Sequence, residues 1–233
     1  MIATLRRDLR SARDRDPAAR SSLEIAICYS GVHALWCHRF SHWLWHHHLK
    51  LLARAFSEVA YLTTGVDIHP AAVLGEGVFI DHACGVVIGE TAEVGEDVTI
   101  YQGVTLGGTS LNKEKRHPTL GNRVTVGAGA KVLGPITIGD DSRIGANAVV
   151  VKSVPPNSVV VGIPGQVIAR SRPHRPTDMP DLESAFMPDL LGSSLHSLLL
   201  RVDELEKDIE GHLPRHDVRP SEVGVWSGED FSI

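Results

Sequence analysis

An aliphatic residue recurs at every sixth position through the middle of the chain. The series is Ile68, Leu74, Ile80, Ile88, Val94, Ile100, Leu106, Leu120, Val126, Val132, Ile138, Ile144 and Val150. A period of six fits neither an α-helix, with about 3.6 residues per turn, nor an open strand, which alternates every two. It is typical of a parallel β-helix, in which each hexad supplies one short strand and three hexads complete a triangular rung. The pattern therefore predicts a mainly β fold.

Two insertions interrupt this series. The first adds two residues between Ile80 and Ile88, and the second adds eight between Leu106 and Leu120. Elsewhere the position after the aliphatic residue is often glycine or aspartate, which suits a tight corner. Because a regular rung needs no extra residues, we expect function at the two insertions.

The segments on either side of the hexads have different patterns. A helical stretch ends near Pro17, Ser21 is placed to cap the next helix, and 32–62 carries apolar residues at helical spacing. After the hexads, a proline-rich stretch precedes a short predicted helix at about 193–210 and an acidic tail. The sequence therefore predicts three parts: an N-terminal helical region (1–65), a β-helix (66–169), and a linker with short helix and flexible tail (170–233).

Composition narrows the function classes. A net charge of -5 disfavours nucleic-acid binding, which requires a basic surface. No apolar run is long enough for a membrane span, and the N-terminus has no signal-peptide pattern. Cys28, Cys37 and Cys84 have no metal-site spacing and cannot all pair, so we expect a reduced, cytoplasmic setting.

The first insertion places an acid beside a base. Since Ile68 and Ile88 begin the same face in successive rungs, Asp67 and the insertion that contains His82 are expected at one corner. A carboxylate that orients an imidazole produces a general base. A polar corner with an incidental histidine is the alternative interpretation.

The second insertion is a basic arm. It contains Lys113, Lys115, Arg116 and His117, and these groups suit a carboxylate or a phosphate. The arm leaves from the far end of the same face, so it is not expected to reach its own His82. A β-helix with flat apolar sides commonly forms a symmetric trimer, and we infer a site shared between subunits. A solvated charged loop is the alternative.

At this point the chain resembles the bacterial serine O-acetyltransferases over nearly its whole length. The motifs that carry the resemblance are RDPA, GVHAL, HWLW, VDIHPAA, DHACGVVIGETA, VTLGG, KRHP, GAGAKVLG and GIPG. The resemblance implies a left-handed β-helix. It also implies transfer of the acetyl group of acetyl-CoA to L-serine, the first step of cysteine biosynthesis.

The resemblance assigns roles to particular residues. It implies His82 as the base, Asp67 as its partner, Asp16 and Asp81 for the substrate amine, and Arg116 and His117 for its carboxylate. Acetyl-CoA is expected along small corner residues, namely Gly107, Gly108, Ala128, Gly129 and Ala146. No metal is expected.

The family also implies partners. L-cysteine is an expected feedback inhibitor, and the tail ending in Ile233 is expected to dock into O-acetylserine sulfhydrylase. The N-terminal region is shorter than in family members that pair two trimers, so a homotrimer is expected. Cys84 stands where the family usually has threonine.

Three other functions stay open at this stage. A hexapeptide acyltransferase with another acceptor has the same rungs, although Asp16, Arg116 and His117 suit an amino acid. A trimeric zinc enzyme needs three convergent histidines, and only His82 and His117 are suitably placed. One predicted helix is dense in histidine: His38, His42 and His46 fall four residues apart, and residues 46–48 are all histidine. Consecutive histidines point about 100° apart on a helix and cannot share one metal ion, so a surface or interface role is favoured. A non-enzymatic scaffold would leave the charged insertions unexplained.

Overall fold

The computed structural model describes residues 2–170, 197–205 and 207. Four helices come first: α1 (Ile2–Arg15), α2 (Ser22–Cys28), α3 (Ser30–His46) and α4 (Lys50–Thr64). The strands that follow are β1 (Val66–Ile68), β2 (Val73–Leu74), β3 (Phe79–Ile80), β4 (Val86–Ile88), β5 (Glu93–Val94), β6 (Thr99–Ile100), β7 (Thr105–Gly107), β8 (Thr119–Leu120), β9 (Thr125–Val126), β10 (Lys131–Leu133), β11 (Thr137–Ile138), β12 (Arg143–Ile144), β13 (Val149–Val150), β14 (Ser158–Val161) and β15 (Gln166–Arg170).

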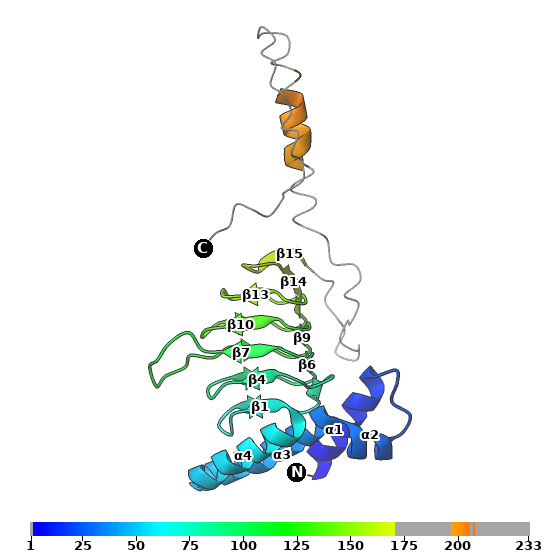
Figure 1. Ribbon diagram of the computed structural model, residues 1–233, viewed down its shortest axis with the longest axis vertical. Coiled ribbons are helices and arrows are strands. Elements are labelled where there is room, and N and C mark those ends of the chain that lie inside the picture. The colour runs from blue at the N-terminus through cyan, green and yellow to red at the C-terminus, as the bar shows by residue number, and fades with distance from the viewer. Residues whose placement is uncertain (1, 171–196, 206, 208–233) are drawn as a thin grey trace, which may run out of the picture. The chain divides into compact units, whose positions relative to one another are not determined.

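The strands stack into three sheets, which form the faces of a coil (Figure 1). Face A has the order β1-β4-β7-β10-β13, face B has β2-β5-β8-β11, and face C has β3-β6-β9-β12-β14 followed by antiparallel β15. Ile68 pairs with Ile88 and Leu106 with Val132, so the hexad positions stack in register. Every member of the aliphatic series lies in a strand, and all except Leu74 are buried. The predicted mainly β fold of hexapeptide rungs is confirmed.

Three columns of turns join the faces. Adjacent turns in a column are about 4.8 Å apart, so residues distant in sequence become neighbours. One sequence insertion lies in each of two columns, and the third column contacts α1. We name them the His82 corner from face C to face A (81–85, 101–104, 127–130 and 145–148), the arm corner from A to B (69–72, 89–92, 108–118 and 134–136), and the α1 corner from B to C (75–78, 95–98, 121–124 and 139–142).

The histidines of α3 dock this helix on the first rung. His38 is buried, and its Nε2–H donates to the carbonyl of Ala72 over 3.1 Å. His42 Nδ1 lies 2.8 Å from the carbonyl oxygen of Pro70. Burial lowers the pKa of His38 to about 3, so its ring stays neutral. Of the surface and interface roles expected for these histidines, His38 and His42 have the second, at a contact between α3 and the arm corner of the same chain.

The helix ends follow local sequence signals. The side chain of Ser21 accepts a hydrogen bond from the backbone of Glu24, which confirms its predicted capping role. The predicted helical stretch 32–62 is divided into α3 and α4, because His48 adopts a left-handed conformation with φ 63°. Gly65 ends α4 in the same conformation, with φ 72°, and leads directly into β1.

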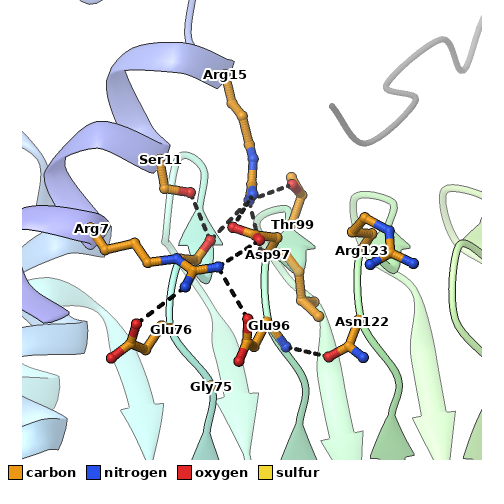
Figure 2. A network of polar contacts seen from close by, with 12 residues as sticks. Arg7, Ser11, Arg15, Gly75, Glu76, Glu96, Asp97, Thr99, Asn122 and Arg123 are labelled. Carbon is orange, nitrogen blue, oxygen red and sulfur yellow. Dashed lines mark hydrogen bonds and ion pairs between the residues drawn. The ribbon is translucent and has the colours of Figure 1, made fainter. Parts of the chain in front are cut away.

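Arginines from α1 fasten this helix to the α1 corner (Figure 2). Arg15 is only 5 % exposed, and its guanidinium donates to the carbonyl of Gly77 at 3.1 Å and to Asp97 Oδ1 at 3.1 Å. Arg7 donates to Glu76 and Asp97, so the clamp spans the first two rungs. Because Asp16 directly follows Arg15, this clamp sets the position of Asp16 against the coil.

We expect Arg15→Ala to lower the free energy of unfolding by about 2 to 3 kcal/mol, since the carbonyls of Gly77 and Val98 and the carboxylate of Asp97 lose a charged donor. Arg13→Ala is the matched control, because Arg13 is exposed on the same helix and should change stability by less than about 0.5 kcal/mol. Urea denaturation of both variants measures the difference. An equal loss of unfolding free energy in the two variants would show that the contacts of Arg15 contribute no more stability than an exposed residue of the same helix.

The second compact unit covers Asp189–Ile233, of which only 197–205 and 207 are described. Residues 197–205 are helical, within the helix predicted at about 193–210. Residue 207 is also helical, while the other residues of the predicted helix and the tail with Ile233 lie outside the described residues. Within the part of the chain that the structure describes, no helix is long and apolar enough to cross a membrane.

Candidate active site

His82 projects from the His82 corner. Its side chain is 74 % exposed, and the backbone is left-handed at His82 (φ 55°) and at Ala83 (φ 53°). Two consecutive non-glycine residues with left-handed backbone conformation are uncommon, and this conformation costs free energy at the turn. The two-residue insertion therefore turns an imidazole outward at a bend that a regular hexad would not make.

One carboxylate lies beside this histidine, and a second lies near enough to act on the first. The imidazole Nε2 of His82 is 3.8 Å from Oδ2 of Asp81. Burial raises the pKa of Asp81, His82 opposes that rise, and the carboxylate of Asp16 adds to it. The phenol of Tyr101 also experiences the field of Asp81, and burial raises its pKa. Asp81 of the His82 corner therefore lies between His82 on its own turn and the carboxylate of Asp16 from the end of α1, and two carboxylates near one another suit an ammonium group.

Asp67 lies on face A, with its backbone paired to Val87. Burial raises the pKa of its carboxyl, and Arg54 of α4 opposes the rise. Among the described residues, His82 pairs with Asp81, and no hydrogen bond or ion pair joins it to Asp67. The pairing of these two residues stays a prediction.

Arg116 and His117 lie at the arm corner, at the other end of β4. The guanidinium of Arg116 donates to Glu90 through Nη2, which leaves its other N–H groups for a ligand. Lys115 Nζ donates to the carbonyl of Thr91 at 2.8 Å and to Glu93 at 2.9 Å. These contacts fold the arm onto the second rung of its own chain.

His117 is buried against Thr91 and Gly89. Its Nδ1 is 2.9 Å from the hydroxyl of Thr91 and also accepts from the backbone N–H of Thr91. Burial lowers the pKa of His117 and so favours the neutral ring, and because Nδ1 accepts from Thr91, the ring proton lies on Nε2. A Cβ on Gly89 would lie 2.0 Å from this ring, so only glycine allows the approach. His117 therefore presents an N–H donor beside Arg116, and this pair suits a carboxylate.

The residues predicted for acetyl-CoA divide between the same two corners. Ala128, Gly129 and Ala146 belong to the His82 corner, where Gly129 stacks on Gly103 (3.5 Å from an added Cβ on Gly103 to the Cα of Gly129). The backbone N–H of Gly129 donates to Gln102, which keeps this column regular. Gly107 and Gly108 lie instead at the base of the arm, where Gly107 ends β7 and Gly108 lies beside Arg116 and His117.

A similarity over the complete chain decides the family. The chain is 61 % identical over 233 residues to the serine acetyltransferase of Mycobacterium tuberculosis, and the match covers all of both chains.

The chain belongs to the serine acetyltransferase family.

Other comparisons agree with this membership. Residues 117–152 match the bacterial transferase hexapeptide family, described as six repeats. The serine acetyltransferase of Neisseria gonorrhoeae, solved in complex with serine, is 42 % identical with a TM-score of 0.70, and the match covers 72 % of this chain and 69 % of that one. The enzyme of Brucella abortus, solved with coenzyme A, is 43 % identical with a TM-score of 0.72, covering 73 % and 68 % of the two chains. A serine acetyltransferase solved with cysteine is 40 % identical with a TM-score of 0.72, covering 73 % and 66 %.

The structure adds site residues that the sequence analysis of this acetyltransferase missed. Tyr29, Glu90 and Thr91 hold Asp16, Arg116 and His117, respectively, in position. Glu90 and Thr91 follow Gly89 in the GETA segment, so their place on the rung below the arm was the available signal. Tyr29 had no such signal, because its contact depends on how the helices pack.

Proposed function

We propose that a second copy of the chain brings its arm corner to the His82 corner of the first, so that a homotrimer contains three shared sites. The observation that carries this proposal is that the residues expected to bind each ligand are divided between the same two corners of the chain. The residues assigned to the substrate amine, Asp16 and Asp81, lie toward one end of β4, and those assigned to its carboxylate, Arg116 and His117, lie toward the other. The residues assigned to acetyl-CoA are divided between the same two ends. The rotation that relates neighbouring subunits of a trimer would bring both halves of the serine site together, and it would do the same for the acetyl-CoA site.

L-serine is the acceptor in this proposal. Its ammonium group lies between Asp16 and Asp81, and its carboxylate receives the guanidinium of Arg116 and the Nε2–H of His117 from the neighbouring subunit. The serine complex of the gonococcal relative supports this substrate. These four contacts direct the serine hydroxyl toward His82.

His82 then acts as the general base. It accepts the hydroxyl proton as serine Oγ attacks the acetyl carbonyl carbon, and the resulting imidazolium returns that proton to the sulfur as the C–S bond breaks. The products are O-acetyl-L-serine and CoA. Asp67 accepts the second ring N–H when the exposed imidazole turns toward face A, and it stabilises the imidazolium. The pantetheine arm of acetyl-CoA lies along Ala128, Gly129 and Ala146, against Gly107 and Gly108 of the neighbour.

L-cysteine occupies the same site. It differs from serine by a thiol in place of the hydroxyl, so the amine and carboxylate contacts accept both molecules. The relative solved with cysteine supports this ligand. Cysteine therefore competes with serine as a feedback inhibitor.

Acetyl transfer to a panel of acceptors tests the proposed function. The panel contains L-serine, L-threonine, L-homoserine and amino sugars, each with acetyl-CoA at saturation. We expect turnover with L-serine to exceed that with amino sugars by orders of magnitude. Preference for an amino sugar would replace this proposal with another hexapeptide acyltransferase activity.

The tail supplies a proposed partner contact with O-acetylserine sulfhydrylase. Ile233 lies outside the described residues, and the proposal uses its chemistry: an apolar side chain with a free α-carboxylate suits a pocket that binds an amino-acid substrate.

We expect deletion of Ile233 to weaken sulfhydrylase binding at least about tenfold, because an apolar anchor is lost. Acetyl transfer should be unchanged, and calorimetry with the sulfhydrylase measures the affinity. Ile233→Leu keeps an apolar terminus and is the matched control. Unchanged affinity after the deletion would eliminate the docking proposal.

A further inference from the structure

The carboxylate of Asp16 is held by two donors. Its Oδ1 accepts from the backbone N–H of Ala18 at 2.8 Å, and its Oδ2 accepts from the hydroxyl of Tyr29 at 2.5 Å. Each carboxylate oxygen can accept two hydrogen bonds, so one acceptor position remains on each. Asp16 is therefore oriented by the protein and still able to bind a cation.

Tyr29 is fixed by contacts that do not involve its hydroxyl. It is the single residue between α2 and α3, and its backbone N–H donates to the carbonyl of Ile25. Its side chain packs against a buried cluster of Ala12, Ile25, Val32 and Phe79. The hydroxyl is thus the polar tip of an otherwise packed ring.

A close contact between α3 and the coil brings Tyr29 to the site. A Cβ on Gly31 would lie 2.0 Å from the carbonyl oxygen of Ile80, so α3 approaches the end of β3 as closely as glycine permits. Ile80 directly precedes Asp81, and Tyr29 is two residues before Gly31. Hydrogen bonding to Asp16 raises the pKa of Tyr29 to about 12, so its hydroxyl remains a donor at every working pH.

We propose that Tyr29 is a positioning residue for substrate binding, whose hydroxyl holds the carboxylate of Asp16 beside Asp81 so that the pair receives the α-ammonium group of serine. This inference rests on the proposed function, because it deepens the role given there to Asp16. Tyr29 itself does not touch the substrate. Its loss should therefore affect binding of the amine and not the chemical step.

The primary test is Tyr29→Phe, which removes one oxygen and keeps the packed ring. We expect KM for L-serine to rise about tenfold, the effect of one hydrogen bond to a charged group. The kcat and the KM for acetyl-CoA should stay within about twofold. Tyr61→Phe is the matched control, because Tyr61 is 45 % exposed on α4 and lies outside the site. An unchanged KM for serine, or an equal loss in kcat, would overturn the proposal.

A ligand without the amine separates positioning from a general structural effect. We expect the inhibition constant of 3-hydroxypropionate against serine to be the same in Tyr29→Phe and in the unmodified enzyme, since this ligand has no ammonium group. Weakening of both ligands by the same factor would indicate that the substitution disturbs the whole site, and it would contradict the proposal.

A double-mutant cycle distinguishes failure of the inference from failure of the proposed function. Asp16→Asn should raise KM for serine, and adding Tyr29→Phe should then change it little, because the two residues act through one carboxylate. If Asp16→Asn leaves KM unchanged, the assignment of Asp16 to the amine is wrong. If Asp16→Asn raises KM and Tyr29→Phe does not, only the role of Tyr29 is wrong.

Discussion

Replacing His82 with alanine should lower kcat for serine acetylation by about 10²- to 10⁴-fold, the usual contribution of a general base. The expected loss is large because a neutral serine hydroxyl attacks a thioester poorly unless its proton is removed during the attack. Binding of CoA should be nearly unchanged, since His82 acts on the acceptor hydroxyl. The side chain of His82 is largely exposed, so its removal should not destabilise the fold.

Steady-state kinetics and calorimetric titration with CoA measure these two effects separately. His47→Ala is the matched control, because His47 is exposed and caps the C-terminal end of α3, whereas the N-terminal end of this helix approaches Ile80. Full turnover in His82→Ala would remove this residue from the mechanism. Loss of CoA binding together with turnover would place His82 in the thioester subsite instead.

Replacing Arg116 with alanine should raise KM for serine by about 10- to 100-fold, because a charge-assisted contact to the substrate carboxylate is lost. The inhibition constant of L-cysteine should rise by a similar factor, since both amino acids use the same carboxylate contact. Lys113→Ala provides the control from the exposed part of the arm. Cysteine inhibition that is intact in Arg116→Ala would indicate a separate regulatory site.

Mixed trimers of His82→Ala and Arg116→Ala subunits test where Arg116 acts. In a shared site, each mixed trimer contains one interface with both native residues, so it should regain about a third of full activity. Co-expression with two affinity tags allows mixed trimers to be isolated and assayed at a serine concentration that is limiting for Arg116→Ala. If activity remains at the level of the parent variants, His82 and Arg116 act within one chain or in separate sites.

The sequence determined the coil because hexad geometry is local. Each aliphatic residue of the series is buried by contacts within its own rung and with the rungs above and below. The pairing of Ile68 with Ile88 follows the spacing of three hexads and the two-residue insertion that can be counted in the sequence. The same regularity identified the two insertions, and with them His82 and Arg116. The corners that hold His82 and Arg116 followed from counting strands in threes, whereas Asp67, expected at the His82 corner, lies within β1 on face A.

The tertiary structure decided the contacts that cross between separate elements. Tyr29 reaches Asp16 through the packing of the helices around one buried cluster, and no periodicity records that packing. Arg15 reaches Asp97 across 82 residues of chain, which depends on the angle at which α1 meets the coil. Periodic sequence patterns specify which side chains point inward along one element. The relative placement of two elements depends on the shapes of both surfaces. The residues that position the site, such as Tyr29 and Arg15, could therefore be identified only in the folded chain.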